Sequence, residues 1–114
     1  MRSVIPILQL QKQLIASIQE ELSDEEALAF QFELLKRSKD LDNSRTIIDV
    51  SNLDVLDSYM SKILTDLTSA LRLQGSKVVL CGVQPVVASA LVDMGMSLGD
   101  IDCYLTLDHA FMGV

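Results

Sequence analysis

The residues best suited to chemistry lie between Asp54 and Tyr59, where a serine is flanked by carboxylates. Ser58 follows Asp57 at the point where a loop is expected to become a helix. The unpaired N–H groups and the positive end of a helix stabilise a phosphate at such a position. A phosphate there would add about 1.5 to 2 negative charges and would repel an acidic partner. The segment predicts a phosphorylation switch; alternatively, Asp57 or Ser58 only caps the helix, a role worth about 1 kcal/mol.

Patterns for catalysis or metal binding are scarce in the rest of the sequence. The single histidine, His109, is interpreted as a surface residue in the first turn of a helix. No C-x-x-C or H-E-x-x-H spacing occurs, and the five glycines form neither a G-x-G-x-x-G nor a Walker arrangement. An enzyme using Asp49, Asp54 and Asp57 would lack a base and a cofactor motif. We therefore expect a protein that is not an enzyme and has no metal and no cofactor.

Composition narrows the class of protein further. A chain of 114 residues, 49% hydrophobic and 22% charged, predicts one globular domain over residues 1–114. The net charge of −7, without a basic cluster beyond Lys36–Arg37, argues against nucleic acid and membranes as partners. The sequence has neither a long apolar run nor a signal peptide, so a cytoplasmic location is expected. Cys81 and Cys103 are interpreted as buried thiols.

The first half of the chain predicts a hairpin and a helix. Strands at 5–10 and 14–17 are separated by a polar turn, and Pro6 favours an edge position for the first strand. Ser23 to Glu26 is a capping box, and the helix that begins there should end near Asp40. Six residues are expected on the buried face of this helix: Ala27, Leu28, Phe30, Phe32, Leu34 and Leu35.

The second half predicts strands alternating with helices. A strand at 46–50 precedes a helix that Gly75 ends, and a strand at 77–81 precedes a helix with Pro85 at its first position. A strand at 102–107 and a short helix capped by Asp108 complete the order. Two sets of residues are assigned here: a polar face of the second helix (Ser61, Lys62, Thr65, Asp66, Ser69, Arg72) and core-filling methionines (Met60, Met94, Met96).

This order of elements predicts an α/β fold, a mixed β-sheet with parallel inner strands and helices packed against it. The loops at 51–58 and 82–85 follow neighbouring parallel strands, so they should meet at one edge of the sheet. The helix that begins at Pro85 is apolar nearly all the way round, and the hairpin edge carries little charge. Both features predict self-association as a dimer or a higher oligomer.

The segment from Asp49 to Leu64 resembles the signature of STAS domains, the anti-sigma-factor-antagonist family. In that family a buried strand ends in Asp, and an Asp-Ser step opens the next helix. The resemblance extends over nearly the whole chain and implies a STAS fold, although the last helix is shorter than the family's and suggests a truncated end. Through 5–8, 17–22 and 82–85, the chain is similar to small single-domain scaffold proteins of the stressosome.

The resemblance implies a function in stress signalling. Ser58 matches the serine that an RsbT-like serine kinase phosphorylates to release itself from the scaffold. The implied partners are this kinase, RsbR-type STAS co-antagonists, further copies of the chain and a PP2C-type phosphatase, in a large cytoplasmic complex. The residues expected to contact the kinase are Asp57, Tyr59, Ser61, Lys62, Thr65, Gln84 and Pro85, with exposed apolar surface continuing through Val86 and Val87.

Two observations limit this interpretation. Soluble anti-anti-sigma factors usually have Ser or Thr and then Gly after the Asp-Ser step, whereas this chain has Tyr59 and Met60. Direct binding of an anti-sigma factor is therefore not expected. The alternative fold is a receiver-like phosphoacceptor domain that uses Asp49, but a receiver needs an acidic pair for Mg²⁺ after its first strand. Gln9, Gln11 and Lys12 stand there instead.

Overall fold

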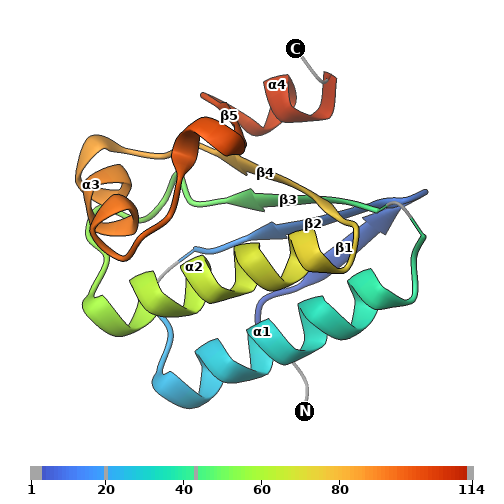
Figure 1. Cartoon of the computed structure of the whole chain (residues 1–114), viewed down its shortest axis with the longest axis horizontal. Helices are drawn as coiled ribbons and strands as arrows, with labels where there is room; N and C mark the ends of the chain where they lie inside the picture. Colours follow the sequence, from blue (N-terminus) through green and yellow to red (C-terminus); the bar gives the residue numbers. More distant parts are fainter. Residues whose placement is uncertain (1–3, 20, 43, 113–114) are drawn as a thin grey trace.

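The computed structural model describes residues 4–19, 21–42 and 44–112, and the remaining positions, including Glu20 of the 17–22 segment and the chain end at Val114, lie outside the described residues. The elements follow the expected order (Figure 1). They are β1 (Ile7–Leu10), β2 (Gln13–Ser17), α1 (Asp24–Lys39), β3 (Arg45–Asp49), α2 (Ser58–Leu73), β4 (Lys77–Cys81), α3 (Pro85–Asp93), a 3₁₀ turn (Leu98–Asp100), β5 (Asp102–Tyr104) and α4 (Leu107–Met112).

The five strands form one mixed sheet in the order β1-β2-β3-β4-β5. β1 pairs antiparallel with β2 through a hairpin, and β2 to β5 pair in parallel, with Ile15, Ile47 and Val79 in register across three strands. The predicted sheet with parallel inner strands is confirmed. A receiver has the doubly wound strand order 2-1-3-4-5. The sequential order and the antiparallel edge of this sheet show that the receiver alternative is wrong.

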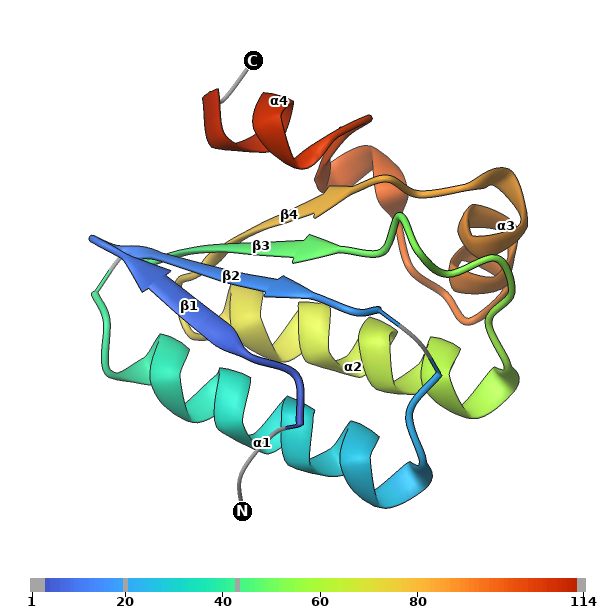
Figure 2. The same ribbon diagram turned by 180° about the vertical axis from the view of Figure 1, so that it is seen from behind.

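Helices cover the two faces of the sheet unequally. α1 and α2 lie side by side along one face, and α4 lies on the other, as both views show (Figure 1 and Figure 2). The larger core is buried under α1, α2 and α3 and includes Leu14, Phe30 and Leu67. The smaller core, which includes Ile47 and Cys81, lies against Ala110 of α4. None of the helices in the described part of the chain is long and apolar enough to cross a membrane.

The capping box predicted for α1 is confirmed. The Ser23 hydroxyl accepts from the Glu26 N–H at 3.1 Å, and the Glu26 carboxylate accepts from the Ser23 N–H at 2.9 Å. The helix ends at Lys39, with Asp40 as its C-cap, close to the expected end. Its predicted buried face is wrong at Leu28 and Phe32, whose side chains are 45% and 55% exposed. The core takes the residues spaced three and four apart from Ala27, which places positions 28 and 32 on the opposite side of the helix.

Some predictions for the last third of the chain are also wrong. β5 ends at Tyr104, and Thr106 rather than Asp108 caps α4, because the Thr106 hydroxyl accepts from the His109 N–H at 3.2 Å. Met94 is exposed, since it is the C-terminal cap of α3 rather than part of its packed face. Cys81 is buried, but Cys103 is exposed on the edge strand.

Candidate functional site

The two loops at the carboxyl ends of β3 and β4 meet, as the sequence predicts. Gly82 has a φ of +71°, and a Cβ added there would lie 2.3 Å from the Cβ of Ser51, so the backbones touch where glycine alone fits. The Gln84 side-chain amide donates to the Ser51 carbonyl at 3.0 Å and to an Asp54 carboxylate oxygen at 3.4 Å. The loop after β4 therefore holds the loop that leads into α2.

The end of β3 is fixed by the Asp49 carboxylate. One of its oxygens accepts from the Ser51 N–H at 3.0 Å, and the other accepts from the Ser17 hydroxyl at 3.3 Å. Burial raises the pKa of the neighbouring Cys81 thiol to about 12, and the Asp49 charge and hydrogen bond add to this effect. Asp49 thus has a structural role, because its carboxylate fixes the turn that follows β3. The Cys81 thiol beside it stays protonated at neutral pH.

Ser58 is the first residue of α2, and Asp57 is the N-cap. The Asp57 carboxylate accepts from the Met60 N–H at 2.7 Å, so Asp57, not Ser58, has the capping role. The Ser58 side chain is exposed, and its hydroxyl has no hydrogen-bond partner among the described residues. The N–H groups of Ser58 and Tyr59 belong to the first turn and have no acceptor within the helix. A group attached to the hydroxyl would meet these two free donors.

The polar face predicted for α2, beside Ser58, is only partly exposed. Lys62 is exposed and pairs with Asp66 at 3.0 Å, and Tyr59 is exposed. Ser61 is 1% exposed, so its expected place on the polar face is wrong. Its hydroxyl donates to the Asp57 carbonyl at 2.7 Å, so this buried polar group has a hydrogen-bond partner. Thr65 is half-buried and donates to the Ser61 carbonyl at 2.8 Å.

The loop after β4 also differs in part from the prediction. Pro85 and Val86 are exposed, and Gln84 is half-buried under its two hydrogen bonds to the neighbouring loop. Val87 is fully buried in the larger core, so the expectation of exposed apolar surface there is wrong. The third residue of α3 turns toward α2, because the helix starts at Pro85 and packs along that side.

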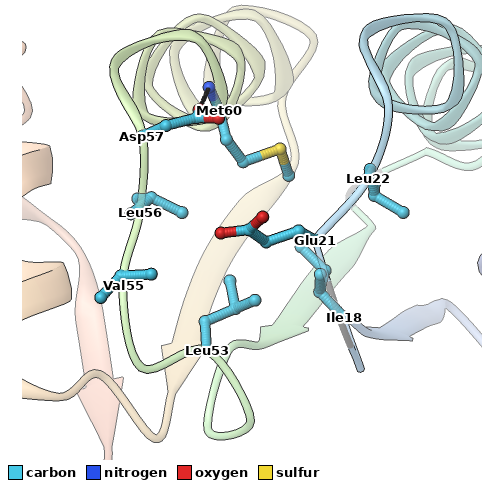
Figure 3. A pocket seen from close by; sticks show the side chains of 8 residues that line it. All are labelled: Ile18, Glu21, Leu22, Leu53, Val55, Leu56, Asp57 and Met60. Carbon is cyan, nitrogen blue, oxygen red and sulfur yellow. Dashed lines mark hydrogen bonds between the residues drawn. The ribbon is translucent and has the colours of Figure 1, made fainter.

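A small apolar hollow adjoins the start of α2, and the sequence did not indicate it. Its volume is about 10 Å³, close to that of a single water position. Figure 3 shows the Glu21 side chain reaching between the apolar side chains of the loop before α2 and those of the segment before α1. Val55 is 57% exposed at its rim. The two apolar residues Val55 and Leu56, between the carboxylates of Asp54 and Asp57, are the feature of the sequence that could have indicated it.

Other kinds of site are not assembled around Ser58. In the ranges that the structure describes, no three His, Cys, Asp or Glu side chains come together as metal ligands. His109 is exposed on α4, which packs against the sheet face opposite α2. The sheet therefore separates the imidazole from Ser58, and the site is a free hydroxyl beside a carboxylate and an apolar rim.

A mixed five-stranded sheet with an antiparallel first pair, helices on one main face and an Asp-Ser step at the start of α2 defines the STAS class of domain. The STAS domain family model matches residues 5–110. The chain belongs to the STAS-domain family.

Two curated relatives come from Bacillus subtilis (strain 168). A protein designated YezB is 31% identical over 70 residues, which cover 60% of this chain and 71% of YezB. The RsbT co-antagonist protein RsbRA is 29% identical over 55 residues, which cover 48% of this chain and 20% of RsbRA. The match thus spans about a fifth of RsbRA.

Two solved structures are similar over almost the whole chain. RsbS of Moorella thermoacetica, in its S58E form, is 30% identical with a TM-score of 0.87, and the match covers 97% of this chain and 94% of that one. A chain from a structure of the stressosome, described as a signal integration and transduction hub, is 30% identical with a TM-score of 0.82, covering 95% and 94%. The fold of this chain therefore matches that of RsbS and that of a stressosome chain over nearly its whole length.

Proposed function

We propose that this protein is a non-enzymatic scaffold of a stressosome, which holds an RsbT-like serine kinase and releases it when Ser58 is phosphorylated. The observation that carries the proposal is the Ser58 hydroxyl, exposed at the first position of α2 and without a hydrogen-bond partner among the described residues. A hydroxyl that has no structural role is available for phosphorylation by a kinase.

Comparison with the RsbS structure supports the choice of Ser58. That protein was solved in a form with glutamate in place of a serine numbered 58, a substitution that introduces negative charge. This chain has a serine with the same number at the start of α2, in a fold that matches over 97% of its length. This similarity supports Ser58 as the residue of this chain at which added negative charge changes function.

The proposed reaction is a simple phosphoryl transfer. The Ser58 oxygen attacks the γ-phosphorus of ATP bound to the kinase, the bond to the β-phosphate oxygen breaks, and ADP leaves. The hydroxyl proton passes to a base of the kinase. This chain supplies only the hydroxyl and its position, because Asp57 already caps the helix and leaves Ser58 free to move into the kinase.

A phosphate on Ser58 would change the charge of the surface around it. It gains about 1.5 to 2 negative charges next to Asp57, which repels an acidic partner surface. The free N–H groups of the first turn hold the phosphate at the helix end. Lys62 lies one turn further along the same helix face, so the phosphate competes with Asp66 for its ammonium group. The result is a surface that no longer fits the kinase.

The proposed kinase-binding surface surrounds Ser58. It includes Asp57, Tyr59 and Lys62 on α2, and Gln84 and Pro85 on the neighbouring loop. Thr65 contributes at its edge, and Ser61 supports this surface from below without reaching solvent. Val55 adds an exposed apolar side chain that the loop places beside Asp57.

The proposal also includes partners beyond the kinase. The similarity to RsbRA, named as an RsbT co-antagonist, and to a stressosome chain supports assembly with RsbR-type STAS co-antagonists and with further copies of this chain. A PP2C-type phosphatase resets Ser58, and the assembly works in the cytoplasm.

The proposal is tested by incubating the protein with an RsbT-like kinase and ATP and measuring its intact mass. We expect one added phosphate, absent in Ser58→Ala and retained in Ser69→Ala, a matched change at an exposed serine of the same helix. Phosphate that persists in Ser58→Ala refutes the assignment. In a pull-down, Ser58→Asp should capture less kinase than Ser69→Asp, and equal capture refutes the electrostatic release.

A further inference from the structure

The side of α1 that faces away from the sheet carries two large apolar residues between opposite charges. We call it the outer stripe; it consists of Glu25, Leu28, Phe32, Lys36 and Lys39, all of which are exposed. These positions are three or four residues apart and therefore share one face of the helix. Leu28 and Phe32 are 45% and 55% exposed because the core lies on the opposite side of the helix.

The charges along the outer stripe change sign from one end to the other. The first turn of α1 contains Asp24 and Glu25, and the last turn contains Lys36 and Lys39. This arrangement complements the helix dipole, which accounts for the charges within one molecule. It does not account for the two apolar side chains at the centre, which lie one turn apart and are rimmed by charged residues, a pattern found at protein–protein contacts.

We propose that the outer stripe is a self-docking surface, on which α1 of a second copy lies antiparallel across a two-fold axis. With the axis between Leu28 and Phe32, the Leu28 side chain of each copy meets Phe32 of the other. Glu25 of each copy then meets Lys36 of the other, since 25 and 36 are nearly equidistant from the axis. Each contact occurs twice because the interface is isologous.

Charge complementarity favours a second copy as the occupant. The chain has a net charge of −7, and the last turn of α1 concentrates three of its nine basic residues. In an antiparallel second copy, the acidic first turn of α1 lies opposite this basic last turn and neutralises its charge. The open edge of β1 is a poorer place for pairing, because the Arg37 guanidinium donates to the Ile7 carbonyl there.

The inference deepens the assembly part of the proposed function and leaves the Ser58 switch unaffected. An interface made by one helix face from each copy is small, so we expect a weak, reversible dimer. Such a contact suits a scaffold in which neighbouring STAS domains are held together by several interfaces at once.

The test is sedimentation velocity of the full chain at a series of micromolar concentrations. We expect a dimer that Phe32→Glu abolishes and that Glu25→Lys weakens by roughly tenfold, because two like-charge contacts replace two ion pairs. The double variant Glu25→Lys/Lys36→Glu should regain the dimer. Leu73→Glu, at a residue 89% exposed at the end of α2, is the matched control and should leave it unchanged.

Three results would overturn the inference: a monomeric wild-type chain, a dimer that survives Phe32→Glu, or a double variant no better than Glu25→Lys. Circular dichroism of each variant separates lost contact from lost folding. Phosphorylation of Ser58 measured in Phe32→Glu distinguishes the two proposals. If Phe32→Glu is monomeric and is still phosphorylated on Ser58, both the docking surface and the switch are supported. If the wild-type chain dimerises but is not phosphorylated, the switch alone is refuted.

Discussion

Gly82→Ala tests whether the two loops of the site are held by direct backbone contact. The residue has a φ of +71°, which costs an alanine about 1 to 2 kcal/mol. The added methyl group would lie 2.3 Å from the Ser51 Cβ and 2.7 Å from its Cα, so the loop must shift, at a further cost of about 1 to 3 kcal/mol. We expect the free energy of unfolding to fall by about 2 to 5 kcal/mol in urea denaturation.

The matched control is Gly75→Ala, at a φ of +87° with no atom within 4 Å of the added Cβ. It should show only the conformational cost, about 1 to 2 kcal/mol. Ser51→Gly in the Gly82→Ala background should recover part of the loss, since the new methyl group still lies 2.7 Å from the backbone of residue 51. Equal destabilisation by Gly82→Ala and Gly75→Ala would refute the close approach and, with it, the coupling between the two loops.

Four further predictions concern the helix cap, the two cysteines and Lys62. Asp57→Ala should lower the free energy of unfolding by about 1 kcal/mol through loss of the N-cap, whereas Ser58→Ala should stay within about 0.5 kcal/mol of wild type; the reverse order in thermal unfolding would assign the cap to Ser58. Because the Cys81 pKa is about 12 in the folded chain, against 9.0 for an unperturbed cysteine thiol, stability should decline as pH rises above 9.0, by up to about 1.4 kcal/mol per pH unit, and less steeply in Cys81→Ala. Iodoacetamide should modify exposed Cys103 and spare Cys81 in the native protein, and equal labelling would contradict that burial. After phosphorylation, Lys62→Met should raise the second pKa of the phosphoserine, followed by ³¹P NMR, and an unchanged titration would show that Lys62 stays with Asp66.

The elements of this fold could be predicted because their signals are local. The capping box at Ser23 and Glu26, Pro85 at the first position of α3, and a β-branched run before Asp49 each fix a boundary by short-range chemistry. The side that each residue faces depends on the rest of the fold. In α1 the apolar residues surround most of the helix, so composition alone did not separate Phe30 in the core from Phe32 in solvent.

The position of the candidate site could be predicted from the sequence, but the roles of its individual residues could not. An Asp-Ser step at a helix start indicated a phosphate position, but both residues are good caps, and the path of the loop decides that Asp57 takes this role. Packing of α2 decides that Ser61 is buried, and its hydrogen bond to the Asp57 carbonyl makes the polar side chain compatible with that position. The approach of Gly82 to Ser51 joins residues 31 positions apart, and no local pattern encodes it.

The most direct test of the Ser58 switch follows a preformed complex of this protein with an RsbT-like kinase. ATP is added, and both the bound kinase and the phosphate on Ser58 are measured with time, the latter by phosphopeptide mapping. Kinase should leave in step with phosphate appearing on Ser58, and the Ser58→Ala complex should remain intact. Kinase that leaves the Ser58→Ala complex at the same rate, or stays bound to chains fully phosphorylated on Ser58, would contradict the account.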